Sequence, residues 1–218
     1  MHSWFLRFAI AFLVLAAAPS AQAQRGVDNI NINGQLVLAA RAGLVQRVKE
    51  LIADGAQVNS RDRNGDSPLN MAAAKGNAEL VDLLLGARAD VQLANLAGVT
   101  PLMSAAFAGS PEIVGKLLAA GAPTDAVDRV KKNAAIYAAG RGCTACLEQL
   151  LQAGMPVNGR LDHDLTLLMW AAGYGHEPTA RLLLQRGAER SLRDDRGKTA
   201  ADIARELNYT VLAGLLEP

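Results

Sequence analysis

The chain has 218 residues, of which 50% are hydrophobic, 20% charged and 4% aromatic, and its formal net charge is +1. This share of aliphatic side chains excludes a disordered chain and is sufficient for a continuous core. A charge near zero without runs of Lys or Arg excludes the electrostatic surface that nucleic-acid-binding proteins use, so we expect no nucleic acid partner.

The first 23 residues are organised like a secretory signal peptide. Arg7 precedes an apolar run over residues 8–18, and the small residues Ala21 and Ala23 provide a cleavage point. The apolar run is shorter than the roughly 20 residues that a membrane anchor needs. We therefore expect a signal peptide at 1–23, a lead-in at 24–33 and no stable membrane anchor after signal removal. The expected location is an exported compartment, the bacterial periplasm, with secretion as the alternative.

From residue 34 onward the sequence repeats every 33 residues. The repeat is marked by one column of glycines and one of alanines: Gly43, Gly76, Gly109, Gly142 and Gly175, and Ala39, Ala72, Ala105, Ala138, Ala171 and Ala204. Asn208 continues the glycine column. Small alanines let neighbouring helices approach closely, and a Gly or Asn in the left-handed conformation ends a helix. These columns therefore predict a first helix in each repeat.

Apolar columns predict a second helix in each repeat. One of them consists of Leu51, Leu84, Leu117, Leu150, Leu183 and Leu216. With the apolar positions beside it, this column forms a stripe at i, i+3 and i+4. Helices this short are marginal alone, so the stripe must be buried between neighbouring repeats. Arg88 stands where other repeats have a closing glycine, and we expect Gly86 to end that helix early.

The opening of the first helix also has its own signal. Hydroxyl residues that can cap a helix occur in four repeats, at Ser67, Thr100, Thr166 and Thr199. Pro68 and Pro101 follow two of them, at the first helical position, where no N–H donor is needed. The fourth repeat departs from this pattern, because residues 131–135 read Lys-Lys-Asn-Ala-Ala. We therefore expect a remodelled turn there.

These motifs resemble those of the ankyrin repeat family. The segments at 65–69 (Gly-Asp-Ser-Pro-Leu) and 98–102 (Gly-Val-Thr-Pro-Leu) look like its turn and helix-opening motif, although the usual His after Thr-Pro-Leu is absent. The 33-residue period and the Thr-Pro-Leu opening argue against a tetratricopeptide array. The resemblance implies an all-α ankyrin-repeat solenoid of stacked helix-turn-helix units with β-turn fingers. Its domain spans 34–218, in repeats at about 34–63, 64–96, 97–129, 130–162, 163–195 and 196–218.

The resemblance also implies a function. Ankyrin arrays bind partners on a concave face built from turn tips and first helices, so we expect a monomeric protein-binding scaffold or adaptor and no enzyme. The residues implied to face the partner are Arg61, Arg63, Asn64, Asp66, Lys75, Phe107, Arg129, Lys132, Arg141, His163, Leu165, Trp170, Tyr174, Arg196 and Lys198.

Three aromatic residues fall close together in the repeat pattern. Tyr137 and Trp170 occupy one slot in adjacent repeats, and Tyr174 lies one helical turn beyond Trp170. Aromatic side chains dominate interface energetics, so this cluster is a candidate hot spot for the partner. Ordinary packing between repeats is the alternative for Trp170 and Tyr137.

Cys143 and Cys146 are the only cysteines, three residues apart. In an oxidising compartment we expect them to form a structural disulfide, with inert thiols or a redox function as alternatives. With His163 and His176 they lack the spacing of a zinc site, and no phosphate loop follows a strand, so we expect no metal and no cofactor. Two further hypotheses are an inhibitor or immunity-type protein that blocks one toxin or enzyme, and a redox or oxidative-stress accessory that uses the cysteine pair.

Overall fold

A computed structural model describes the backbone of residues 21–217 and the side chains of residues 32–217. Residues 1–20 of the predicted signal peptide lie outside this part, so the signal and its cleavage stay a prediction. Residues 24–33, the predicted lead-in, belong to the first helix, α1 (Ala21–Ala42). None of the helices among the described residues combines the length and the apolar character that a membrane span requires.

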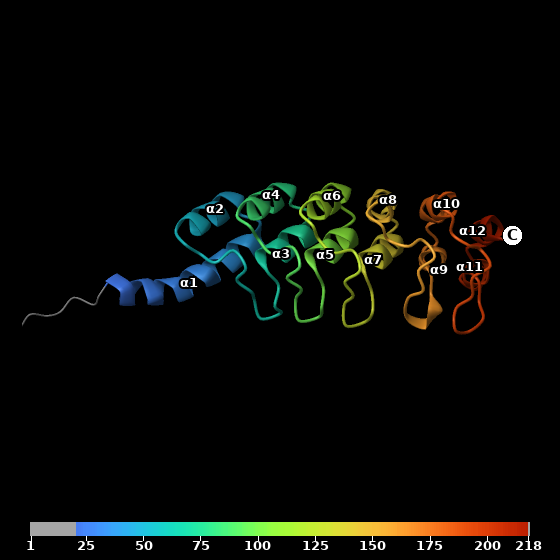
Figure 1. Ribbon diagram of the computed structural model, residues 1–218, viewed down its shortest axis with the longest axis horizontal. Helices are drawn as coiled ribbons and strands as arrows, with labels where there is room; N and C mark the ends of the chain where they lie inside the picture. Colours follow the sequence, from blue (N-terminus) through green and yellow to red (C-terminus); the bar gives the residue numbers. More distant parts are fainter. Residues whose placement is uncertain (1–20, 218) are drawn as a thin grey trace, which may run out of the picture.

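The described chain forms two rows of helices, as Figure 1 shows. The first helices of the repeats are α1, α3 (Pro68–Lys75), α5 (Pro101–Ala108), α7 (Ala134–Arg141), α9 (Leu167–Gly173) and α11 (Ala200–Glu206). The second helices are α2 (Val45–Ala53), α4 (Ala78–Gly86), α6 (Pro111–Ala119), α8 (Thr144–Gln152), α10 (Glu177–Gln185) and α12 (Thr210–Leu216). Extended fingers project from the row of first helices (Figure 1). The predicted all-α solenoid with six helix pairs is confirmed.

The periodic small and aliphatic residues form the core of the stack. Ala72, Ala105, Ala138 and Ala171 are fully buried where α3, α5, α7 and α9 lie against one another. The leucine column of the second helices is also buried, with exposures of 0–1% from Leu51 to Leu216. These residues belong to one continuous hydrophobic cluster. Burial of each repeat against its neighbours therefore holds helices that are too short to be stable alone.

The predicted helix caps are confirmed. The hydroxyl oxygens of Ser67, Thr100, Thr166 and Thr199 each accept the backbone N–H three residues ahead. In the fourth repeat the side chain of Asn133 does the same for Ile136, at 3.0 Å, which the sequence analysis missed. Asn208 ends α11 with φ 64°, as predicted from its place in the glycine column.

The expected early end of the second helix in repeat two is wrong. Helix α4 contains nine residues, as do α2 and α6, and it ends at the same point of the repeat. Arg88 itself adopts the left-handed conformation, with φ 61°, that glycine provides in the other repeats. The chain therefore needs no glycine at this position, at the cost of some backbone strain.

In most fingers, an Asp or Asn at the same repeat position organises the turn through hydrogen bonds from the backbone of that turn. Asp62, Asn95, Asp128 and Asp194 occur at equivalent positions, and the Oδ1 atom of each accepts the backbone N–H groups two and four residues ahead, at 2.8–3.0 Å. The fourth-repeat finger keeps this arrangement because Lys131 adopts φ 60°, so the predicted remodelling there is wrong.

The remodelled finger is the next one along the chain. Leu161 replaces the organising Asp or Asn, and a short 3-10 helix (Asp162–Asp164) forms in its place. Backbone hydrogen bonds join other neighbouring fingers, from Leu96 N–H to Asn64 O, Arg129 N–H to Ala97 O and Asp195 N–H to His163 O, at 2.9–3.1 Å. In the described chain no such bond joins Val130 and Asp162. The remodelled turn thus leaves these two fingers without a backbone hydrogen bond between them, and we call them the unfastened fingers.

We predict that Asp194→Asn makes the protein less sensitive to acid. Burial alone would raise the pKa of Asp194, but hydrogen bonds from Lys198 and Arg196 outweigh it, and the pKa lies below its usual value. A lowered carboxyl pKa stabilises the fold above the unfolded value of about 3.9, and this contribution is lost as the pH falls through the folded value. Asn95 shows that an amide fits the same position.

Urea unfolding at pH 7 and pH 3 tests this prediction. At pH 7 the variant should lose about 1 kcal/mol, because neutral hydrogen bonds replace charge-assisted ones. Between pH 7 and pH 3 it should lose less stability than the wild type. Asp54→Asn, at an exposed carboxylate outside the fingers, is the control. An equal acid loss in wild type and Asp194→Asn would contradict the assignment.

Candidate functional site

A cleft of about 360 Å³ lies on the side of the first helices, across α5, α7 and α9. Its lining residues come from three consecutive repeats and are Phe107, Lys132, Ile136, Tyr137, Gly140, Arg141, Trp170, Tyr174 and His176. The structure therefore brings together the three aromatic residues that the sequence analysis grouped. It adds Phe107, which was predicted to face the partner but was not assigned to this cluster.

The aromatic rings form two walls of the cleft. Phe107 and Tyr137 pack edge to face, with ring centroids 5.8 Å apart and an interplanar angle of 83°. Trp170 and Tyr174 stack at 6.1 Å and 13°, as expected for residues four apart at the end of one helix. Phe107 is 57% exposed and Tyr174 51% exposed. The cleft thus presents two half-exposed aromatic rings above two more deeply packed ones.

The two deeper aromatic residues have different polar surroundings. The Tyr137 hydroxyl donates to Asp128 Oδ2 at 2.5 Å, which ties α7 to its finger. Burial, and then this hydrogen bond to a carboxylate, raise the pKa of Tyr137, so the hydroxyl remains protonated. The indole Nε1 of Trp170 is buried and has no acceptor in the described chain. Tyr137 therefore has a packing role, whereas Trp170 keeps a donor unused.

Two cations flank the aromatic walls. Lys132 Nζ lies 5.0 Å from the Trp170 ring centroid, and Arg141 Cζ lies 5.5 Å from that of Phe107, both within cation–π range. Neither side chain forms an ion pair with a carboxylate in residues 32–217. The two positive charges are therefore available to a ligand in the cleft.

His176 supports the open end of the cleft, a role that the sequence analysis missed. Its ring stacks on Tyr174 at 6.2 Å and 8°, and its Nε2 lies 2.9 Å from the Gly140 carbonyl oxygen, to which it donates. The ring covers Gly142, where a Cβ atom would lie 2.8 Å from Nδ1. The signal was present in the repeat, because His176 follows the periodic Gly175 directly and is the N-cap residue of α10, and Gly142 is the equivalent glycine of the preceding repeat.

A second hollow of about 200 Å³ continues the cleft toward the finger tips. It shares Lys132, Ile136 and Trp170 with the cleft and is also lined by Val130, Lys131, Leu161, Asp162, His163 and Leu165. His163 Nδ1 lies 2.7 Å from Asp195 Oδ2, and this hydrogen bond is the main reason that the pKa of His163 is raised. The predicted residues His163 and Leu165 therefore belong to the same groove as Trp170.

Several other predicted partner-facing residues have structural contacts instead. Arg61 donates to the carbonyl oxygens of Gly65 and Ala94, and Asp66 accepts from Asn95. Ion pairs hold Arg196 to Asp194 and Lys198 to Glu206. The remaining predicted residues, which have exposed side chains, are Arg63, Asn64, Lys75 and Arg129.

The cysteine pair lies at the start of α8 and does not line the cleft. The Sγ atoms of Cys143 and Cys146 are 2.03 Å apart, at disulfide distance, and Cys146 is fully buried. Within the described residues, no three His, Cys, Asp or Glu side chains are grouped so as to hold a metal ion.

Comparisons with known proteins agree with this architecture. A family model described as "Ankyrin repeats (3 copies)" matches residues 36–128, 109–194 and 135–217. Among solved structures, the crystal structure of EF0377, an ankyrin repeat protein, is similar, with a TM-score of 0.76 and 31% sequence identity. The similarity covers 84% of this chain and 96% of that one. No curated protein matches the chain.

We predict that Gly142→Ala destabilises the protein more than Gly109→Ala. Both glycines have φ near 72°, so each substitution should cost about 1 kcal/mol in backbone strain. Only at Gly142 would the new Cβ meet a neighbour, the His176 ring, whereas nothing lies within 4 Å at Gly109. In a His176→Ala background, chemical denaturation should show equal costs for the two substitutions. A cost that is equal in the wild-type background as well would contradict the contact.

Proposed function

This chain belongs to the ankyrin repeat family, and from this premise we propose that it is a protein-binding scaffold that captures a protein partner on its concave face in an exported compartment. Ankyrin repeats generally serve as protein–protein interaction modules. The observation that carries the proposal here is the cleft between Phe107 and Tyr174.

The cleft has the composition of an interaction hot spot. Aromatic residues and Arg carry much of the energy of protein interfaces, and they act best where packed neighbours exclude water. Phe107 and Tyr174 are half exposed, and Arg141 lies directly over the Phe107 ring. The stacked repeats hold these side chains in place, so binding requires little ordering of this protein.

The acidic residues that organise the fingers favour binding over catalysis. Asp128 and Asp194 are buried and accept backbone N–H groups of their own turns. Asp62 does the same and pairs with Arg41. Carboxylates with these structural roles are poor candidates for general acid and base, so we infer a stoichiometric binding protein.

The proposed compartment is supported by the sequence of residues 1–23 and is compatible with the cysteine pair. Disulfides persist in oxidising compartments such as the periplasm. We infer that Cys143 and Cys146 form a structural disulfide there, and that partner binding does not require its redox chemistry.

Removal of the two exposed rings should abolish partner capture. Affinity capture from the native compartment should recover a partner with the wild type and lose it with Phe107→Ala combined with Tyr174→Ala, because hot-spot truncations cost about 2 kcal/mol or more each. The melting temperature should change little, since both side chains are half exposed. Leu44→Ala and Val211→Ala, at exposed residues outside the cleft, should capture normally. Capture that survives the double substitution would refute the proposal.

The cysteine pair can be tested separately. Protein taken from the periplasm and treated with an alkylating agent should gain no adduct without prior reduction and two adducts after it, as read by intact mass. Cys143→Ala with Cys146→Ala should lose less than about 3 kcal/mol, because the closed loop is short, and should keep full partner capture. Uptake of two adducts without reduction would disprove the disulfide, and loss of capture in a folded variant would favour the redox hypothesis.

A further inference from the structure

We propose that the segment held in the cleft is an acidic, extended stretch of the partner protein that inserts one aromatic or large aliphatic side chain between Phe107 and Tyr174. This inference rests on the proposed function and specifies the chemistry of the partner.

The volume and walls of the cleft fit a single apolar side chain. About 360 Å³ is at the low end of the range for small-molecule sites, so the cleft fits a side chain better than a large cofactor. The rings of Phe107 and Tyr137 lie on one side and those of Trp170 and Tyr174 on the other. An inserted ring would therefore meet aromatic faces and edges, a geometry that aromatic pairs favour.

The charges around the cleft select an acidic segment. Lys132 and Arg141 flank the rings without a carboxylate partner in the described chain, and the nearby carboxylate of Asp128 is buried and bonded to Tyr137. On the same face and equally without an ion pair in the described chain are Arg63, Lys75, Arg129 and Lys131. A partner with negative charges beside its anchor would complement this surface.

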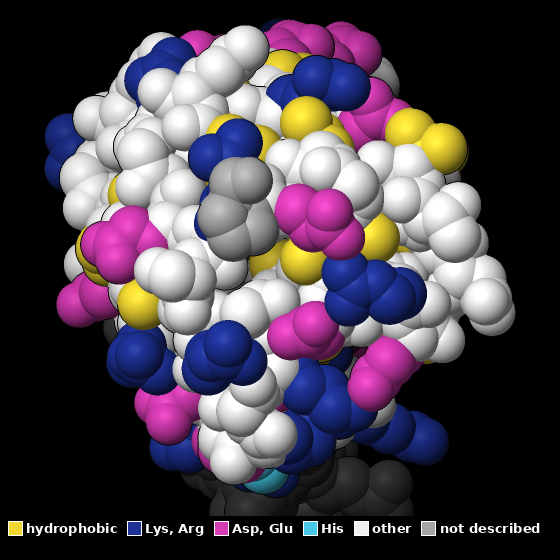
Figure 2. Space-filling model, turned by 90° about the vertical axis from the view of Figure 1, so that its right-hand side faces the viewer, with side chains coloured by type: hydrophobic (Ala, Val, Ile, Leu, Met, Phe, Trp, Pro, Cys, Tyr) yellow, Lys and Arg dark blue, Asp and Glu magenta, His cyan; other side chains and the backbone are white. Residues whose placement is uncertain are grey.

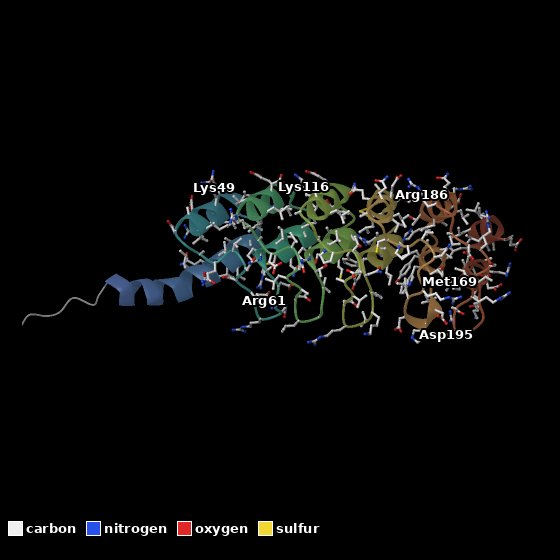
Figure 3. The ribbon with its side chains drawn as sticks, in the orientation of Figure 1. Lys49, Arg61, Lys116, Met169, Arg186 and Asp195 are labelled. Carbon is white, nitrogen blue, oxygen red and sulfur yellow. A yellow bond between two sulfur atoms is a disulfide. The ribbon has the colours of Figure 1, made fainter. Side chains whose placement is uncertain are left out.

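Several cations on the outer helices are neutralised by carboxylates. On the outer helices, Lys116 pairs with Asp82 and Arg186 pairs with Glu148. Figure 3 shows Lys49, Lys116 and Arg186 on this outer side, opposite the fingers that carry Arg61 and Asp195. Figure 2 looks onto the C-terminal end, where side chains of both signs are interspersed. Around the cleft, in contrast, Lys132 and Arg141 have no carboxylate partner in the described chain.

The groove also has unused backbone and indole groups. The second hollow lies between the two unfastened fingers, where no backbone bond joins Val130 and Asp162. An extended polypeptide can use such groups, as in strand addition to a sheet edge. The buried Nε1 of Trp170 lacks an acceptor, and an oxygen of the segment that reached it would remove the cost of that unmade bond.

Labelled heptapeptides test the inference by fluorescence polarisation. The probes are an acidic peptide with one central phenylalanine, its serine analogue, and a Lys-rich peptide with the same phenylalanine. Only the first should bind, with an affinity that falls at least tenfold between low and high salt. It should also shift the tryptophan emission, and Trp170→Phe should abolish that shift. Equal binding of the serine analogue or of the Lys-rich peptide would overturn the proposal.

Charge reversal supplies the matched variants. Lys132→Glu with Arg141→Glu should weaken the acidic peptide at least tenfold. Lys49→Glu with Arg190→Glu makes the same change in net charge at exposed positions outside the cleft and should leave its affinity within about twofold. Equal weakening by both pairs would show only a long-range charge effect and would overturn the assignment to the cleft.

The outcomes separate this inference from the proposed function. If no acidic peptide binds but the Phe107 and Tyr174 variant still loses its partner, the acidic segment is wrong and the scaffold function stands. If sedimentation shows self-association that depends on the cleft, its occupant is a second copy of this chain, and the inference is again wrong. If the Phe107 and Tyr174 variant captures the partner as well as the wild type does, the proposed function itself is wrong.

Discussion

The close contact between first helices at the alanine columns is the constraint on which the rest of the structure depends. Ala105, Ala138 and Ala171 are fully buried where α5, α7 and α9 meet, so no larger side chain fits there. This contact fixes the offset of each repeat on the next, and any two residues 33 positions apart become neighbours on the surface. Tyr137 and Trp170 face one cleft for this reason, although neither helix alone would place them.

The fold was predictable because each of its signals is local and repeated. A cap such as Thr100 or a helix stop such as Asn208 acts within a few residues, and the period shows where it recurs. The errors came from positions where glycine was taken as necessary. Arg88 and Lys131 adopt positive φ themselves, because the flanking turn and helix stabilise them by more than the strain costs. Leu161, which lacks the side-chain acceptor of Asp128 and Asp194, was the visible sign of the finger that does change.

The candidate site was only partly predictable. The repeat pattern shows which side chains lie on the side of the first helices and fingers, but it does not show which of them form contacts within the chain. Arg61 and Lys132 were both assigned to partner binding, yet Arg61 fastens two fingers whereas Lys132 lies over an indole ring. The cleft depends on three repeats at once. Its aromatic residues could be grouped from their positions in the repeat. The stacking of His176 on Tyr174 could not be predicted in this way, because it depends on the His176 ring lying against Gly142.

The unfastened fingers at Val130 and Asp162 have a consequence for cooperativity. In a linear array, stability is a sum of intrinsic and nearest-neighbour contributions, and partial unfolding separates the array where the coupling is weakest. With one backbone bond fewer at this junction, the first four repeats and the last two have more freedom to melt as separate blocks. A molecule bound across the junction would touch both blocks, so it would sharpen the unfolding transition as well as raise its midpoint.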